Sequence, residues 1–306
     1  SEVMQITRRT FGASLIAAVP ALAAKPDSNF GGVRVGINAP YSFHGMPAGA
    51  DDVLNYLLEL GLSTVELRSQ PIERAFGAPI PANGRLPIAD PAGAEALEKW
   101  RLAASMDSFK QFRKKWQDAG VAIEIVKFDG VDRMKDEVVD YAFHLAKAAG
   151  AKAISCEIPV SKTEWLGQFA AKHKMMVGYH GHGQVHNPEA FATPESWERA
   201  MSYSKYNGIN LDIGHFTAGN GFSPMPFIKK HADRITHLHL KDRKLNNGPN
   251  MPWGEGDTPV REVLQLMKRE KYPFQATIEF EYPVPAGSTV LKEIAKCVAF
   301  CKASLA

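Results

Sequence analysis

The sequence predicts an α/β protein with the (β/α)8 architecture of a TIM barrel. Two observations predict it: short apolar runs rich in β-branched residues alternate with stretches of helical periodicity, and eight such units follow one another. The predicted strands cover residues 33–38, 64–67, 122–127, 153–158, 175–179, 208–212, 235–240 and 276–280. The predicted helices cover residues 51–60, 92–119, 132–149, 162–173, 194–203, 226–232, 259–271 and 288–302.

The order of these elements favours a closed barrel over an open sheet. Strands that alternate with helices pair in parallel, and eight units over about 275 residues match the size of a closed barrel. The alternative, a doubly wound open sheet, is disfavoured because no glycine-rich phosphate-binding turn follows the first strand. Residues 70–91, rich in proline, glycine and alanine, form an insertion that either covers the barrel mouth or is a passive surface loop.

Composition limits the classes of function. The chain has 306 residues, 45% of them hydrophobic, and can therefore bury a large core. Its formal net charge is +3 and it has no long basic run, so we expect no nucleic-acid partner. The cysteines, Cys156, Cys297 and Cys301, lack the spacing of a metal knuckle, and Cys297 and Cys301 are expected to be small buried hydrophobic residues.

The N-terminus resembles a twin-arginine export signal. Arg8 and Arg9 precede an apolar run, residues 12–24, whose end resembles a small-residue cleavage site. We expect residues 1–30 to be an export signal and linker, residues 31–306 to be a single catalytic barrel domain, and the mature protein to be periplasmic or otherwise exported in a folded state. The run is too short for a stable membrane span. The alternative is an ordinary amphipathic N-terminal helix.

The predicted seventh strand contains a pair of histidines. Successive side chains of a strand point to opposite faces, so His237 and His239 lie on one side and Leu238 and Leu240 on the other. An isolated pair is more often two hydrogen-bonded core histidines, but seven of the ten histidines fall between His180 and His239. A metal or acid/base site is therefore the hypothesis to weigh against core packing.

Polar side chains gather at the carboxyl ends of the predicted strands, where the site of such a barrel lies. They are Glu66 and Arg68 at strand two, Glu157 at strand four, and His180 and His182 at strand five. At strand six they are Asp212 and His215, at strand seven His237 and His239, and at strand eight Glu279 and Glu281. Carboxylate and imidazole groups at strands five to eight form a ring that can hold one divalent cation.

Four segments of this ring resemble the xylose isomerase-like superfamily of sugar (phosphate) isomerases and epimerases, which includes ketose 3-epimerases, inosose dehydratase and, more distantly, endonuclease IV. The segments are Tyr179-His180-Gly181-His182, Leu211-Asp212-Ile213-Gly214-His215, His237-Leu238-His239-Leu240-Lys241-Asp242 and Thr277-Ile278-Glu279. The resemblance covers nearly the whole mature chain. It implies a TIM barrel that holds one Mn²⁺, Mg²⁺, Co²⁺ or Zn²⁺ ion.

Matched by position, the resemblance also implies roles for single residues. The implied metal ligands are His180, Asp212, His239 and Glu279. His215 is implied to bind substrate or help the metal, and Lys241 or Arg243 to face substrate hydroxyls. We add Glu157, Glu279, His182, His215 and Lys241 as catalytic candidates, and Arg68, Arg243, Trp253 and Glu281 as substrate-binding candidates.

One position departs from the epimerases, in which strand five supplies a glutamate that is both ligand and acid/base. Here that position is His180, and Glu157, one strand back, is the substitute, as a base or as a further ligand. An unperturbed histidine titrates near roughly 6.5, so His182 or His215 can protonate a departing oxygen. This favours elimination, or hydration in reverse, over epimerisation of a free ketose.

The predicted function is that of a divalent-metal-dependent isomerase, epimerase or lyase that forms an enediolate of a carbohydrate or keto-sugar. Elimination or hydration of a 3-keto-glycoside is the specific hypothesis. The predicted partner is a small sugar, and a homo-oligomer is left open. The alternatives are a metal phosphodiesterase like endonuclease IV, which needs histidines that strands two to four lack, and a non-catalytic sugar-binding barrel.

Overall fold

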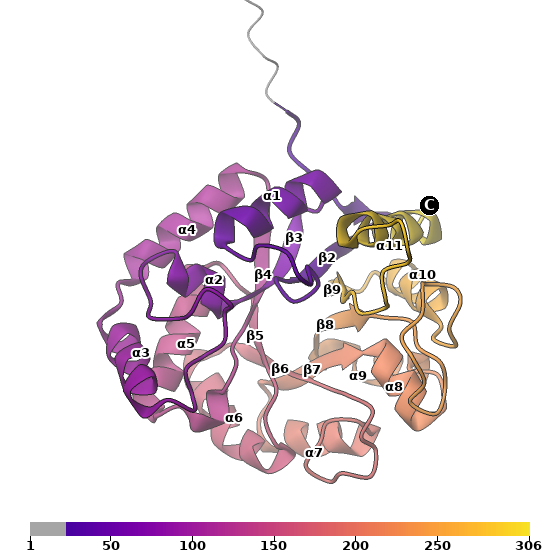
Figure 1. Ribbon diagram of the computed structural model, residues 1–306. Coiled ribbons are helices and arrows are strands. Elements are labelled where there is room, and N and C mark those ends of the chain that lie inside the picture. Colours follow the sequence, from indigo (N-terminus) through magenta and orange to yellow (C-terminus); the bar gives the residue numbers. More distant parts are fainter. Residues whose placement is uncertain (1–22) are drawn as a thin grey trace, which may run out of the picture.

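The computed structural model describes residues 23–306, which form a closed barrel of eight parallel strands surrounded by helices (Figure 1). The TIM barrel that the sequence predicts is confirmed. The twin-arginine segment, with Arg8 and Arg9, lies outside the described residues.

The barrel strands follow one another in chain order around the sheet. They are β2 (Val33–Ala39), β3 (Thr64–Arg68), β4 (Ala122–Lys127), β5 (Ala153–Cys156), β6 (Met176–His180), β7 (Asn207–Asp212), β8 (Ile235–Leu240) and β9 (Gln275–Ile278). A short strand, β1 (Asn29–Phe30), precedes them and pairs antiparallel with β2.

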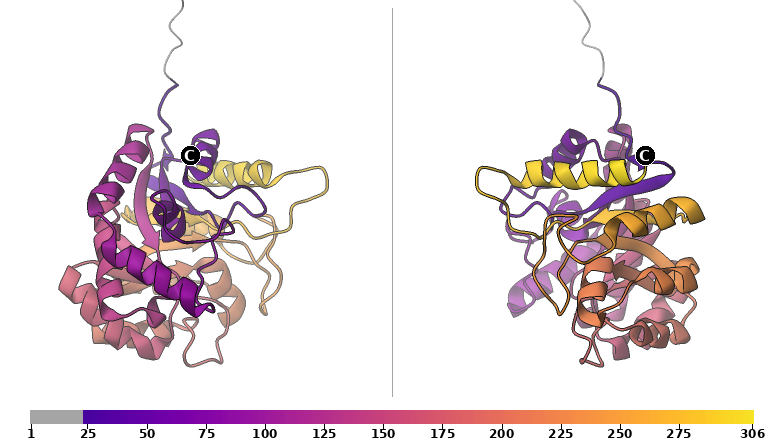
Figure 2. Two further views of the ribbon diagram at one scale, coloured as in Figure 1. Left: turned by 60° about the vertical axis from the view of Figure 1, so that its left-hand side comes forward. Right: turned by 90° about the vertical axis from the view of Figure 1, so that its right-hand side faces the viewer.

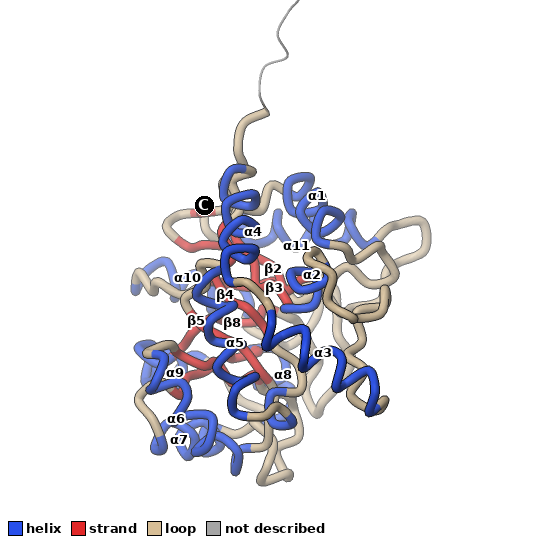
Figure 3. Tube along the Cα trace, turned by 90° about the vertical axis from the view of Figure 1, so that its left-hand side faces the viewer, coloured by secondary structure: helices blue, strands red, loops and turns tan. Residues whose placement is uncertain are grey.

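The helices pack around the outside of the barrel, as the enclosed strands in Figure 3 show. They are α1 (Ala50–Leu60), α2 (Ser69–Arg74), α3 (Pro91–Ala103), α4 (Met106–Asp118), α5 (Asp136–Ala148), α6 (Thr163–His173), α7 (Pro194–Tyr203), α8 (Ile213–Asn220), α9 (Met225–His231), α10 (Val260–Glu270) and α11 (Val290–Ser304). Short 3-10 helices lie at Val131–Arg133, Val160–Lys162 and Ala232–Arg234.

The last strand closes the sheet onto the first. Val35 and Ile37 of β2 pair in parallel with Ala276 and Ile278 of β9. Closure leaves these strands with no open edge, and the open-sheet alternative is excluded.

Alternation along the strands divides the interior into two environments. In β8, Leu238 and Leu240 are fully buried in the apolar core, while His237 and His239 lie on the other face, also fully buried. The same period of two places Glu66 of β3 between the apolar Val65 and Leu67. The barrel therefore has an apolar outer layer beneath the helices and a polar lumen.

The helix predicted over residues 92–119 is two helices. Ala104 has extended backbone angles (φ −66°, ψ 140°), and α4 starts anew after Ser105, whose hydroxyl accepts a hydrogen bond from the Asp107 amide at 3.3 Å. The prediction was wrong here because the apolar period continues across a serine cap that ends one helix and begins the next.

The insertion after β3 begins with α2 and continues as a loop to α3. Its residues Asn83 and Gly84 line a cavity of about 270 Å³ together with Tyr41 and Arg68. Tyr41 follows β2, and Arg68 is the last residue of β3. The insertion therefore lies beside the rim of the barrel, on the same side as the long loops. Figure 2 shows the barrel from the side, with these loops projecting from it. Among residues 23–306, none of the helices combines the length and apolar character that crossing a bilayer requires.

Candidate active site

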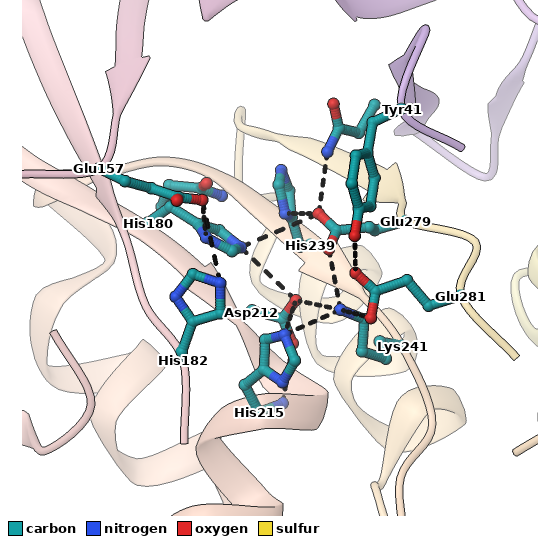
Figure 4. A network of polar contacts seen from close by, with 12 residues as sticks. Tyr41, Glu157, His180, His182, Asp212, His215, His239, Lys241, Glu279 and Glu281 are labelled. Carbon is teal, nitrogen blue, oxygen red and sulfur yellow. Dashed lines mark hydrogen bonds and ion pairs between the residues drawn. The ribbon is translucent and has the colours of Figure 1, made fainter. Parts of the chain in front are cut away.

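Four side chains meet at the carboxyl ends of four successive strands (Figure 4). His180 ends β6, Asp212 ends β7, His239 lies in β8, and Glu279 directly follows β9. One atom from each lies within 4.8 Å of the others, and none of the four side chains is more than 4% exposed. The sequence expected these residues to meet, and we refer to them as the four-residue set.

Several atoms of this set are buried without a hydrogen bond among the described residues. They are Nδ1 and Nε2 of His180, Oδ2 of Asp212 and Nδ1 of His239. The His180 Nε2 atom lies 3.6 Å from Asp212 Oδ2 and 3.9 Å from Glu279 Oε2. Buried polar atoms are nearly always paired, and two imidazoles with two carboxylates are a donor set for Zn²⁺ and related divalent ions. The residues therefore fit a divalent cation.

Local sequence explains how two of these side chains are held. The Oδ1 atom of Asp212 caps α8 by accepting a hydrogen bond from the His215 amide at 2.8 Å, which leaves Oδ2 facing the set. After His180 the chain passes closely over Trp197 of α7. A Cβ atom at Gly181 would lie 2.4 Å from that indole, so this position requires glycine.

Lys241 supplies the positive charge of the site. Its Nζ lies 2.8 Å from Glu279, 3.2 Å from Asp212 and 3.1 Å from Glu281. Although burial disfavours the ammonium form, the carboxylates of Asp212 and Glu279 raise the pKa of Lys241. Lys241 is therefore an ammonium group that balances carboxylate charge, and not a base.

His215 lies between two cationic side chains. Lys241 Nζ is 2.9 Å from its Nε2 atom and Arg243 Nη1 is 2.7 Å from its Nδ1 atom. Burial lowers the pKa of His215 to about 3, although Asp212 opposes the shift. This shift favours the neutral ring, and the expected roles of His215 as a proton donor and a substrate contact stay predictions.

Glu157 and His182 lie beside the set on the β5 and β6 side. Glu157 Oε1 is 2.9 Å from His180 Nδ1, 3.1 Å from Lys127 Nζ and 3.9 Å from His182 Nε2. Although burial opposes it, contacts with His180 and Lys127 lower the pKa of Glu157, which is therefore ionised. Burial lowers the pKa of His182, with its neighbour His180 adding to the shift.

Glu281 lies on the opposite side of the set. It accepts hydrogen bonds from the Tyr41 hydroxyl at 2.8 Å and from Asn250 Nδ2 at 3.2 Å. Burial raises the pKa of Glu281, with Glu279 adding to the shift and Lys241 opposing it. Of the carboxylates of the site, Glu281 therefore holds a proton more readily than Glu157, Asp212 and Glu279, whose pKa values are lowered.

The other expected substrate-binding residues lie in different places. Arg243 belongs to the network through His215. Arg68 pairs with Asp129 at 3.1 Å, and its guanidinium lies 5.2 Å from the centroid of the Tyr41 ring. Trp253 packs edge to face against Phe300 of α11, with the ring centroids 5.7 Å apart, and its role in substrate binding stays a prediction.

Three residues of the site were not predicted from the sequence. They are Asn38, which donates to Glu279 at 2.9 Å, Tyr41, and Lys127. All three lie at or just after the ends of β2 and β4. The pattern that predicts the other site residues, a polar side chain at a strand end, therefore holds for these three residues as well.

Comparison with known proteins agrees with this architecture. The sequence model of the family described as xylose isomerase-like TIM barrel matches residues 155–300. An inosose dehydratase of Clostridium botulinum is 37% identical over 79 residues, 25% of each chain. One of Lactiplantibacillus plantarum is 26% identical over 149 residues, 42% of this chain and 48% of that protein. The matches therefore span half or less of these curated relatives.

Solved structures match over a larger part of the chain. The probable 3-DHS dehydratase AsbF of Bacillus anthracis has a TM-score of 0.60 at 14% identity, covering 89% of this chain and 97% of its own. The 3-keto-D-glucoside 4-epimerase YcjR of E. coli has a TM-score of 0.59 at 10% identity, covering 89% and 99%. The IOLI protein, with a bound zinc atom, has a TM-score of 0.57 at 13% identity, covering 89% and 96%. At these identities the likeness concerns the fold, a TIM barrel, and the match to the xylose isomerase-like family model covers residues 155–300.

Proposed function

We propose that this protein is a divalent-metal-dependent enzyme that acts on a keto-sugar, and that its reaction is elimination, or hydration in reverse, on a 3-keto-glycoside. The observation that carries the proposal is the four-residue set, whose ligand atoms gather within 4.8 Å of one another and in which both ring nitrogens of His180 and the Oδ2 atom of Asp212 are buried without a hydrogen bond among the described residues. Such a set is costly to bury unless a cation pairs with it.

The proposed cofactor is one Mn²⁺, Mg²⁺, Co²⁺ or Zn²⁺ ion held by the four-residue set. Bound there, a divalent ion would supply Lewis acidity that makes the hydrogen beside a carbonyl group easier to remove. A structurally similar protein with a bound zinc atom, the IOLI protein, supports this assignment through its fold.

We assign the two proton transfers of the reaction to two carboxylates that lie on opposite sides of the four-residue set. We assign removal of the hydrogen beside the carbonyl to Glu157, because it is ionised and lies outside the four-residue set. Lys241 stabilises negative charge that develops on the sugar oxygen, because its ammonium group is fixed among carboxylates. We assign the return of a proton to the departing oxygen to Glu281, because burial raises the pKa of this carboxyl and it therefore holds a proton more readily than the other carboxylates of the site.

The names of similar proteins favour elimination. The curated relatives are inosose dehydratases and one similar structure is a probable 3-DHS dehydratase; a dehydratase removes water. Another similar structure acts on a 3-keto-D-glucoside. Together they support a sugar-modifying enzyme. The substrate class that we propose is a keto-sugar whose leaving group is β to the carbonyl, on the carbon next to the one that loses its hydrogen.

The test is ¹H NMR in D₂O of the metal-reconstituted protein with a panel of 3-keto-glycosides and free ketoses. We expect exchange of the hydrogen beside the carbonyl and the appearance of an unsaturated keto-sugar that absorbs in the near ultraviolet. A Glu157→Gln variant should lose the exchange while keeping the metal. Rapid epimerisation of free fructose or tagatose, with no absorbing product from any 3-keto-glycoside, would contradict the proposal.

A further inference from the structure

We propose that Glu66 of β3 is a positioning residue, which orients the His239 ring so that its Nδ1 atom faces the cation of the four-residue set. The inference rests on the metal proposed above. It concerns a carboxylate outside that set, on a strand that contributes no residue to it.

The two nitrogens of His239 point in opposite directions. The Nδ1 atom lies 2.5 Å from Glu279 Oε2, on the side of the four-residue set. The Nε2 atom lies 2.7 Å from Glu66 Oε2, on the far side of the ring. A histidine that binds a metal almost always donates its other N–H to a carboxylate or carbonyl, which fixes both the tautomer and the ring orientation. Glu66 is placed to accept that N–H.

Glu66 is itself held in place by a second histidine. The same Oε2 atom contacts His237 Nε2, and His237 Nδ1 lies 2.8 Å from the hydroxyl of Thr236. His237 and His239 are two residues apart on one face of β8, so one carboxylate reaching across the lumen from β3 meets both rings. The orientation of His239 is thus fixed by a chain of contacts within the described lumen.

Glu66, His237 and His239 also have the residue types of a second cation site, but the spacing of their atoms argues against one. Two atoms bound to one zinc ion at about 2.0–2.2 Å in a tetrahedron lie more than about 3 Å apart. The Glu66 oxygen is 2.7 Å from one imidazole nitrogen and closer to the other, which is hydrogen-bond spacing. In the four-residue set the His239–Glu279 contact, at 2.5 Å, has hydrogen-bond spacing as well. The two groups differ at His180, whose Nε2 atom lies 3.6 and 3.9 Å from the carboxylates of the set and leaves room for an ion.

Stability alone does not account for Glu66. Its side chain is fully buried, as are both histidines that it contacts. Well-packed apolar residues in place of such a buried polar group are often neutral or stabilising. A carboxylate at this position is explained by its contact with His239 Nε2, which orients the ring so that Nδ1 faces the four-residue set.

The test compares the Glu66→Gln variant with the wild-type protein by competing Co²⁺ or Zn²⁺ against a chelator of known affinity. Glutamine has nearly the same shape, but its amide accepts from one imidazole N–H while its own NH₂ faces the other. We expect one ion per chain in both proteins and a roughly 10–100-fold weaker affinity in the variant. The control is Glu124→Gln, which alters a buried strand carboxylate paired with Arg34 and Lys152, outside the metal clusters; its affinity should equal that of the wild type.

A second readout separates positioning from general damage to the fold. In the Zn²⁺-loaded protein, ¹H–¹⁵N spectra of the histidine rings should show His239 as a single tautomer with a low-field Nε2 proton, which moves upfield in Glu66→Gln. Equal affinity and an unshifted proton would overturn the proposal. So would a second bound ion that is lost in Glu66→Gln and in His237→Gln. If the wild-type protein binds no ion, the metal itself is refuted, and the role of Glu66 with it.

Discussion

At the scale of single residues, His239 makes the stability of the metal-free protein depend on pH. Although burial disfavours the imidazolium, Glu66 and Glu279 raise the pKa of His239 from 6.5 to about 10. Because the folded pKa lies above the unfolded one, this stabilisation is complete below pH 6.5 and is lost as the pH rises through 10. Urea unfolding of the chelator-treated protein should therefore give a free energy that falls between pH 6.5 and pH 10.

The matched control for this pH dependence is His239→Gln. Glutamine does not titrate, so the fall over the same interval should be smaller in the variant than in the wild type. An equal fall in the two proteins would show that other groups cause it.

Which site residues the sequence reveals depends on whether they lie at strand ends. His180, Asp212, His239 and Glu279 were expected to meet because the carboxyl ends of parallel strands share one edge of a barrel. The partner of Glu66 was not predictable, because its contact with β8 crosses the lumen and depends on how the barrel closes. The contact of Trp253 with Phe300 was not predictable, because a loop has no period from which the direction of a side chain follows.

At the scale of elements, a buried ion pair joins the insertion to the helix that follows it. Arg101 of α3 contacts Glu73 of α2 through Nε and Nη2, and the two side chains are 5% and 0% exposed. Removing one partner of such a pair leaves a buried, unpaired charge and costs roughly 3–5 kcal/mol. We expect Arg101→Met to lower the free energy of unfolding by about this amount, measured by urea titration.

Two further variants test this interpretation. The double variant Arg101→Met with Glu73→Met should recover much of the loss, because neither charge remains. Lys135→Met, which breaks the exposed pair with Glu98, should have no measurable effect. If the single and double variants are equally destabilised, packing around Arg101, and not its charge, is what stabilises the insertion.

The sequence predicted most elements because their periods are distinct, but it missed features that depend on local capping. The sequence predicts one helix over residues 92–119 because the apolar period continues through Ser105. The helix α8 was missed because all but its last two residues are buried, which hides any amphipathic pattern. The aspartate that caps α8, Asp212, was predicted as a site residue because of its position at a strand end.

At the scale of the whole molecule, we propose that the protein is exported folded through the twin-arginine pathway. The basis is the sequence alone, Arg8 and Arg9 ahead of an apolar run. Replacing both arginines by lysine should block export, measured by fractionating cells that produce each form. Unchanged export of the double variant would refute this proposal and would leave the barrel and its site unaffected.

The most direct test of the account is the metal content of the purified protein after chelation and reconstitution with Zn²⁺ or Co²⁺. We expect one ion per chain in the wild type and in His186→Ala, whose exposed histidine lies outside the four-residue set. We expect strongly reduced metal in Asp212→Ala and in Glu279→Gln, because each removes a carboxylate from that set. Undiminished metal in both of these variants would contradict the site.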